Sequence, residues 1–416
     1  MKPATPPQRL SRKRLAWRDN RGNTAILFAL LVPVLVGGAG LAVETSFDYV
    51  SQSRLQGGAD AAAYAAALEN MAGSSSATIA AAANQQATAN GWASATGAIT
   101  VTTPPTSGAY AGLSNAVQVQ LTAHPPRFFT AYFASTPVTL NARSVAISQT
   151  AANACILALN KTASQAIQVQ GNTTVTLNGC DVMSDSVAND AVNVWGSANL
   201  HADCAVSVGG VTNHGGLTLG CGAPITQAPR VGDPFASLPT PAPGQHQSIP
   251  NGSPHGVTTL QPGSYNSGMS LSGDIVLQPG VYYVSGGDFS VGSNATVSGS
   301  GVTIYLAAGS HTNFNGNAVV NMSAPTSGAY SGVLFFGDRN GTGSNIFNGD
   351  ASSHLTGDIY FPSQAVDYRG NYSGINGCTQ IVADTVQWTG STTIAVNCAA
   401  QGMGNIPARL AVKLVE

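Results

Sequence analysis

The sequence predicts a mainly β protein with an N-terminal transmembrane helix, in which a small α+β module leads into a parallel β-helix-like solenoid. Three observations indicate this fold class: an uncharged apolar run near the N-terminus, a helical period that changes to a period of two, and many short β-prone segments between Gly, Asn and Ser turns. Charged residues make up only 8% of the 416 residues. This composition is typical of exported, turn-rich proteins and argues against a cytoplasmic helical enzyme.

Charge is distributed asymmetrically along the chain. Residues 1–21 hold seven of the 16 basic residues and one of the 18 acidic residues, so the remaining chain is mildly acidic. A basic head before an apolar run indicates the orientation of a membrane protein, because basic residues stay on the cytoplasmic side. We therefore expect residues 1–21 to be a basic cytoplasmic segment. The remaining chain has no basic patch, so no nucleic acid is expected as a partner.

The uncharged run is long enough to cross a membrane. It begins at Ala25, contains Pro33 and Gly37, and ends at Val43. In a helix these residues span about 29 Å, close to the thickness of the hydrocarbon core. Residues 22–44 are therefore predicted to be a transmembrane helix that anchors the chain. A cleaved signal peptide is the alternative, because small residues near the end of the run resemble a cleavage site.

A family resemblance rests on the residues around this run. The matching positions, in order, are Arg21, Gly22, Glu44, Leu55, Gln56, Ala59, Asp60, Ala61, Ala62 and Ala63. This order resembles the N-terminal module of TadE/TadG-like proteins, which belong to the tight-adherence (Flp-type) pilus-assembly system. The resemblance implies a single-pass protein of the bacterial inner membrane, with its N-terminus in the cytoplasm and its bulk in the periplasm. Membrane lipid and other pilus-assembly subunits are the implied partners.

Residues 45–150 are predicted to form a helix followed by a small α+β module. The helix continues to about residue 70, with Gly57-Gly58 as a weak point because Gly disfavours helix. Ser residues at 74–76 are expected to cap a second helix, which ends at Asn90-Gly91. Small apolar side chains dominate both helices, and such a face packs on its own domain or on a partner helix.

Two segments of the same module alternate apolar and polar residues. They lie at 116–121 and 138–142 and are predicted to be strands. The connection between them contains the aromatic residues Phe128, Phe129, Tyr132 and Phe133. We expect these rings to fill the core of the module, with an interaction patch as the alternative.

Residues 151–416 are predicted to be a β-helix-like periplasmic domain. Short β-prone runs alternate with turns, and LQPGSY at 260–265 returns as LQPGVYYV at 277–284. Stacked coils explain this alternation of short strands and turns, although a β-sandwich is the alternative. A Pro-rich connection at 222–258 interrupts the strands, either as a hinge or as a segment extended across the solenoid. Residues 408–415 are expected to form a last strand.

All six cysteines lie beyond residue 150. An even number confined to the exported part indicates disulfides in an oxidising compartment. The spacing favours pairing between neighbours, although six cysteines allow about 15 connectivities. The favoured pairs are Cys155–Cys180, Cys204–Cys221 and Cys378–Cys398.

Signals of catalysis are weak. The sequence has no GxSxG, HExxH or Walker motif and no CxxC pair, so no cofactor and no metal is expected. Four carboxylates that lie close together in the sequence, Asp338, Asp350, Asp358 and Asp367, are the strongest candidates for an enzymatic cleft. The expected function is non-enzymatic assembly or anchoring of a Flp-type pilus. The alternatives are a polysaccharide-active β-helix enzyme and a surface adhesin that contacts the cell wall or a glycan.

Overall fold

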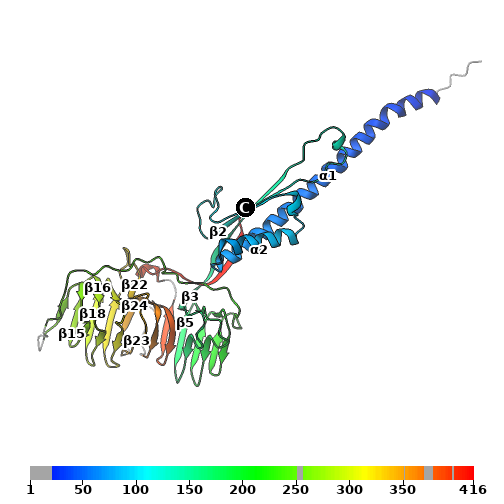
Figure 1. Cartoon of the computed structure of the whole chain (residues 1–416). Coiled ribbons are helices and arrows are strands. Elements are labelled where there is room, and N and C mark those ends of the chain that lie inside the picture. The colour runs from blue at the N-terminus through cyan, green and yellow to red at the C-terminus, as the bar shows by residue number, and fades with distance from the viewer. Residues whose placement is uncertain (1–20, 251–255, 351, 370–377, 396–397) are drawn as a thin grey trace, which may run out of the picture.

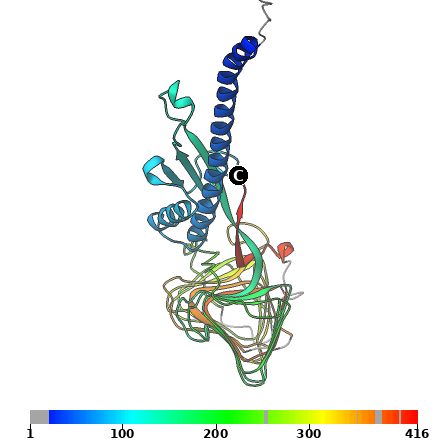
Figure 2. The same cartoon turned by 90° about the vertical axis from the view of Figure 1, so that its right-hand side faces the viewer.

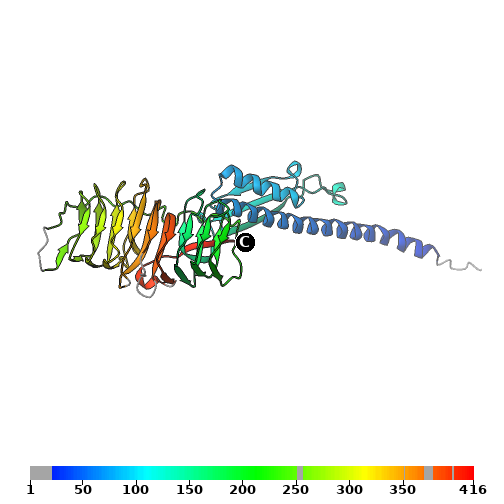
Figure 3. The same cartoon turned by 90° about the horizontal axis from the view of Figure 1, so that it is seen from below.

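The computed structural model describes residues 21–250, 256–350, 352–369, 378–395 and 398–416. Its shape is elongated: a long helix and a small module form a stalk, and the stalk joins a β-solenoid (Figures 1 and 3). Figure 2 looks along the solenoid, so that its coils lie one behind another. The predicted fold class, a mainly β chain with one long apolar N-terminal helix, is confirmed.

Helix α1 (Arg21–Met71) is one continuous helix, about 77 Å long at 1.5 Å per residue. It passes through Pro33 and through Gly57-Gly58 without a break. Helix α1 therefore contains both the predicted transmembrane segment and the helix predicted to follow residue 44. The 18-residue apolar window of α1 is 0% buried within the protein. One exposed apolar segment of this length, near the N-terminus, fits a single-pass membrane protein.

The stalk module packs the second half of α1 against a helix and a sheet. Its elements are α2 (Ser76–Ala89), η1 (Ser94–Thr96), β1 (Ile99–Thr102), β2 (Ala116–Ala123), η2 (Thr130–Tyr132), β3 (Leu140–Ala158) and β27 (Ile406–Leu414). The Ser75 hydroxyl accepts the Thr78 N–H and caps α2, as the sequence predicts. Strands β1, β2, β3 and β27 form an antiparallel sheet.

The solenoid consists of two groups of coils. The first group contains the end of β3 followed by β4 (Ile167–Val169), β5 (Thr174–Asn178), β6 (Asp181–Ser184), β7 (Val192–Val194), β8 (Asn199–Ala202), β9 (Ala205–Ser207), β10 (Val211–Asn213) and β11 (Gly216–Leu219). The second contains β12 (Thr258–Leu260), β13 (Gly263–Tyr265), β14 (Met269–Leu271), β15 (Asp274–Leu277), β16 (Gly280–Val284), β17 (Phe289–Val291), β18 (Thr296–Ser300), β19 (Val302–Leu306), β20 (Thr312–Phe314), β21 (Val319–Ser323), β22 (Val333–Gly337), β23 (Ser344–Phe347), β24 (His354–Tyr368), β25 (Thr379–Trp388) and β26 (Thr392–Ala395), followed by η4 (Ala399–Gln401).

The two groups stack into one continuous solenoid. The chain enters the solenoid through β3, in the middle of the stack, between the two groups. One face has the strand order β13-β16-β19-β22-β24-β25-β3-β6-β9, with every neighbour paired in parallel. A second face runs β14-β17-β20-β23-β24-β25-β4-β7-β10, also in parallel. Strand β3 therefore has β25 on one side and β6 on the other. Stacked parallel coils of this kind rule out the β-sandwich alternative.

The repeated LQPG segments occupy adjacent coils. Leu260 pairs with Leu277 in the β12–β15 ladder, so the offset between the two repeats in the sequence is one coil of the solenoid. Tyr265 and Tyr282, from the same repeats, stack with ring centroids 5.9 Å apart. Inside the following coils, Phe289, Phe314 and other rings continue the core.

The Pro-rich connection lies extended along the solenoid instead of acting as a hinge. Its described part, residues 222–250 and 256–258, returns from the end of the first group to the far end of the second. Ile225 bridges to Val206 on β9, and His246 bridges to Ser264 on β13. The connection therefore covers both outer edges of the face that runs from β13 to β9, which protects these edges from pairing with other chains.

Apolar side chains of this connection cover a second hydrophobic layer on the outside of the same face. Val231, Phe235 and Leu238 pack against buried residues such as Tyr360. Polar contacts hold the segment in place: Asp185 accepts hydrogen bonds from the backbone N–H groups of Val231 and Gly232 at 2.9 and 3.0 Å.

The three disulfides of the structure are Cys155–Cys180, Cys204–Cys221 and Cys378–Cys398. These are the pairs that the spacing favours. Cys155 and Cys180 join the starts of two successive coils, and Cys204 and Cys221 join the start and the end of the next coil. All six cysteines are thus engaged.

Asp358 lies on β24 and is fully buried. With its nitrogen turned toward the neighbouring acceptors, the Gln380 amide donates to Asp358 Oδ1 at 2.9 Å. Among the residues that the structure describes, Oδ2 has no hydrogen-bond partner. Burial raises the pKa of Asp358 well above its usual value, because a desolvated carboxylate is costly.

The position of Asp358 predicts that the solenoid loses stability as pH rises. A raised folded-state pKa has no effect below about pH 4, where the carboxyl is protonated in both states, and destabilises the fold progressively above that pH. Asp358→Asn mimics the protonated form, so its free energy of unfolding should rise relative to that of wild type between pH 5 and pH 8. Urea unfolding of both proteins at the two pH values measures this difference, and a difference that does not change with pH contradicts the assignment.

Candidate functional site

Three alanines of the family resemblance, and the nearby Ala66, lie inside the stalk module. Ala59, Ala62, Ala63 and Ala66 are each 0% exposed and pack among α2 and the sheet. Of the two alternatives for this alanine-rich face, packing on its own domain or on a partner helix, these side chains adopt the first. Small side chains are needed there because α1 packs closely on α2 and on β2 and β3 of its own chain.

Two polar residues of α1 bind the open edge of β3. Gln52 donates to the Asn141 carbonyl at 2.8 Å. Gln56, one turn later, donates to the Arg143 carbonyl at 3.0 Å and to the Asp60 carboxylate at 2.8 Å. Gln56 belongs to the family resemblance, whereas Gln52 was missed, and its position four residues earlier on the same face is the signal that identifies it.

The C-terminal residues continue this edge. Val145 donates its N–H to the Glu416 carbonyl at 2.9 Å, two residues after Arg143, which Gln56 contacts. The Glu416 side chain forms an ion pair with Arg143, and that contact holds the pKa of Glu416 below its usual value. Along this edge of β3, the backbone groups are thus hydrogen-bonded first by β27, then by Glu416 and finally by side chains of α1.

Glu44 binds the connection between β2 and β3. It is only 4% exposed. Its carboxylate accepts the Thr130 N–H at 2.7 Å, the Phe128 N–H at 3.3 Å and the Thr130 hydroxyl. Arg127 donates to the same Thr130 hydroxyl oxygen at 2.8 Å. The acidic residue that follows the apolar run therefore attaches a loop to α1.

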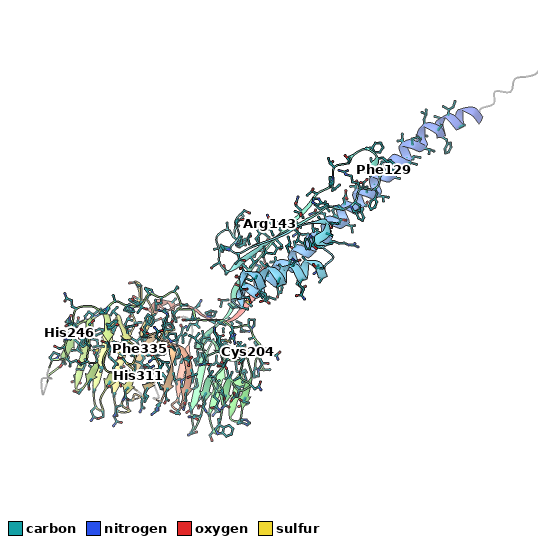
Figure 4. All side chains as sticks on the ribbon, viewed as in Figure 1. Phe129, Arg143, Cys204, His246, His311 and Phe335 are labelled. Carbon is teal, nitrogen blue, oxygen red and sulfur yellow. A yellow bond between two sulfur atoms is a disulfide. The ribbon has the colours of Figure 1, made fainter. Side chains whose placement is uncertain are left out.

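The aromatic residues of this loop do not fill the core, contrary to expectation. Tyr132 and Phe133 are 89% and 79% exposed, and Phe128 is 50% exposed. Phe128 packs edge-on against Phe47 of α1, with ring centroids 4.9 Å apart, and Phe129 lies directly against Gly40. Figures 1 and 4 show the loop, with Phe129 labelled, extending along α1 away from the solenoid. The rings lie outside because the loop extends beyond the module's sheet.

The anchor residues of the sequence lie where α1 leaves the module. Ala25, Pro33 and Val43 are exposed and Gly37 is half-buried. Arg21 and Gly22 form the start of α1. The basic segment before Arg21 lies outside the described residues.

The four carboxylates near the C-terminal coils have separate structural roles. Asp338 accepts the Tyr305 hydroxyl, and Asp367 pairs with Arg369. Asp350 accepts the Ser352 N–H at 2.9 Å within a turn, and Asp358 is buried on β24. In the part of the chain that the structure describes, no three His, Cys, Asp or Glu side chains are grouped so that they could hold a metal ion.

The cavities near the stalk are open and shallow. One of about 230 Å³ lies between α1 and the turn after α2, where Arg54, Trp92 and His124 contribute to its wall. A single imidazole without a neighbouring carboxylate offers no acid–base pair.

Comparison with known proteins supports the N-terminal resemblance. Residues 22–71 match the family model described as Putative Flp pilus-assembly TadE/G-like. These residues coincide with α1 except for its first residue. No curated protein and no solved structure matches the chain.

Proposed function

We propose that the protein is a non-enzymatic membrane component of a Flp-type pilus-assembly system, with its N-terminus in the cytoplasm and its stalk and solenoid in the periplasm. The continuity of α1 carries this proposal. One helix passes from the apolar run into the stalk core, and the TadE/G-like match covers this stretch. The helix thus couples the membrane rigidly to the exported body.

The orientation is supported from both sides of the membrane run. Seven basic residues precede it, and basic residues are retained in the cytoplasm. Three disulfides follow it, and disulfides persist in the oxidising periplasm. The solenoid then serves as a rigid spacer or docking body, because its coils are joined into continuous parallel sheets.

The orientation is tested by reporter fusions in cells. A reporter enzyme that is active only outside the cytoplasm should be active when fused after Glu416 and inactive when fused after Asn20. The full-length chain should also resist extraction from membranes by alkaline carbonate. A reporter that is active after Asn20, or a freely soluble full-length chain, contradicts the proposal.

The role in pilus assembly is tested by gene replacement. Cells that lack the chain should lose surface pili, and the full chain should restore them. Asp350→Ala changes an exposed turn carboxylate and should restore pili equally well, since no catalysis is involved. Normal pili in the deletion strain would overturn the assembly role. A glycan-cleaving activity that Asp350→Ala abolishes would favour the enzyme alternative, and pili that form but no longer attach to surfaces would favour the adhesin.

A further inference from the structure

The loop of residues 124–139 has unusual features for a hairpin connection. It joins the antiparallel strands β2 and β3, a connection that usually takes two to five residues. It holds four aromatic side chains and a single formal charge, on Arg127. Arg127 uses its guanidinium within the loop, donating to the Thr136 carbonyl at 2.7 Å and to Thr130. Long ordered loops of this kind usually have a function.

The loop overlaps the apolar run of α1. A Cβ atom built on Gly40 would lie 2.4 Å from Cδ2 of Phe129, so the ring rests directly on the helix backbone. Gly40 belongs to the uncharged run and precedes Glu44 by about one helical turn, roughly 6 Å. If the run spans the hydrocarbon core, the Phe129 ring lies below the level at which Glu44 meets the polar layer.

Phe133 lies close to Phe129, with ring centroids 5.7 Å apart. Tyr132 and Phe133 extend from the loop, and Phe47 and Tyr49 extend from α1 just beyond Glu44 at 38% and 78% exposure. Aromatic side chains prefer the interface between hydrocarbon and headgroups, where an apolar ring and a polar edge are both satisfied. In water these rings would form an exposed apolar patch, and such patches usually mark a surface that binds a partner or a membrane.

We propose that residues 125–137 form a second membrane contact, in which Phe129, Tyr132 and Phe133 enter the lipid interface beside α1. This rests on α1 spanning the membrane, as in the proposed function. The bilayer is the chosen occupant because the patch continues the lipid-facing surface of α1. With α1 and the loop both in contact with the membrane, the depth of the stalk and its rotation about the axis of α1 are fixed. A single helix would leave both free.

The disulfides make a direct test convenient. All six cysteines are paired, so an introduced cysteine is the one reactive thiol. The full chain is reconstituted in phosphatidylcholine vesicles after labelling Phe133→Cys with an environment-sensitive fluorophore. Leu35→Cys serves as the control within the span, and Tyr64→Cys as the control on the stalk, about 30 Å beyond Glu44.

The expected result is that brominated lipids quench the labels at 133 and 35 at least twofold more strongly than the label at 64. A label at 133 that behaves like the label at 64, while the label at 35 is quenched, overturns the loop contact and leaves the anchor standing. Absence of quenching at 35 contradicts the membrane span itself. The label at 133 could also be shielded from water in native membranes but not in vesicles. That result overturns the lipid contact and indicates a protein partner.

A matched pair of glycines tests the geometry. Gly40→Ala, placed beneath the Phe129 ring, should displace the loop and reduce quenching at 133 to the level at 64. A Cβ on Gly38 meets no atom within 4 Å, so Gly38→Ala should leave quenching at 133 unchanged. Equal quenching in both variants contradicts the packing of the loop on Gly40.

Discussion

Replacing Ala62 with Leu is expected to destabilise the stalk module by about 1–3 kcal/mol. Ala62 is 0% exposed and packs in the cluster that joins α1, α2 and the sheet. A Leu side chain adds three carbons where the neighbours leave no space, so α1 and α2 must separate. Adding Ala66→Leu, also at 0% exposure, should bring the loss to about 2–6 kcal/mol, comparable with the whole stability of many domains.

Gly57→Leu is the matched control for Ala62→Leu. Gly57 lies on the same helix, and a Cβ built on it meets no atom within 4 Å. The same side chain introduced there should be neutral or slightly stabilising, because Gly disfavours helix. Amide hydrogen exchange of α2 in the full chain in detergent measures both variants. Unchanged protection of α2 in Ala62→Leu, together with a loss of pili, would restore the partner-contact interpretation of this helix face.

The sequence patterns predicted features that depend on neighbours along the chain. The apolar run, the second helix and the LQPG repeat each reveal their structure within a short stretch of sequence. Leu260 and Leu277 pair as the repeat predicts. The cysteine pairs also follow from proximity, because the two members of each disulfide are only 17 to 25 positions apart.

The features that the sequence did not predict depend on distant partners. Nothing local in β3 indicates that β25, which lies near the other end of the chain, pairs beside it. The residue that Gln52 contacts is likewise 89 positions away. The sequence left two alternatives for the Pro-rich connection, a hinge or an extended segment, because apolar residues such as Phe235 are too sparse to decide between them.

The aromatic loop was misinterpreted for another reason. Phe128, Phe129, Tyr132 and Phe133 are apolar enough for a core, and in a water-soluble module they would be placed there. The loop extends past the sheet to Gly40, within the apolar run that we propose spans the membrane. Under that proposal the general preference of aromatic residues for burial still holds, because the bilayer interface is the environment that covers them.

The C-terminal strand joins the stalk to the solenoid, and its removal is expected to uncouple the two. β27 pairs with β3 from Ala146 to Ala154. β2 stops pairing at Ile147, and the coil strand β6 begins its pairing at Ala154. β27 is thus the strand that pairs with the stretch between them, where Gln149 and Thr150 are already exposed.

Deleting residues 405–416 should therefore expose residues 148–153 to a protease of broad specificity. Each lost hydrogen bond contributes about 1 kcal/mol, and about 1.4 kcal/mol is a factor of ten, so cleavage there should accelerate at least about tenfold. The products should be a membrane-bound stalk and a folded, disulfide-bonded solenoid, resolved by mass spectrometry. Leu414→Ala, at a side chain that is 41% exposed, is the control and should leave the rate near that of wild type. Cleavage that stays at the wild-type rate after the deletion would mean that β3 alone holds the stalk on the solenoid.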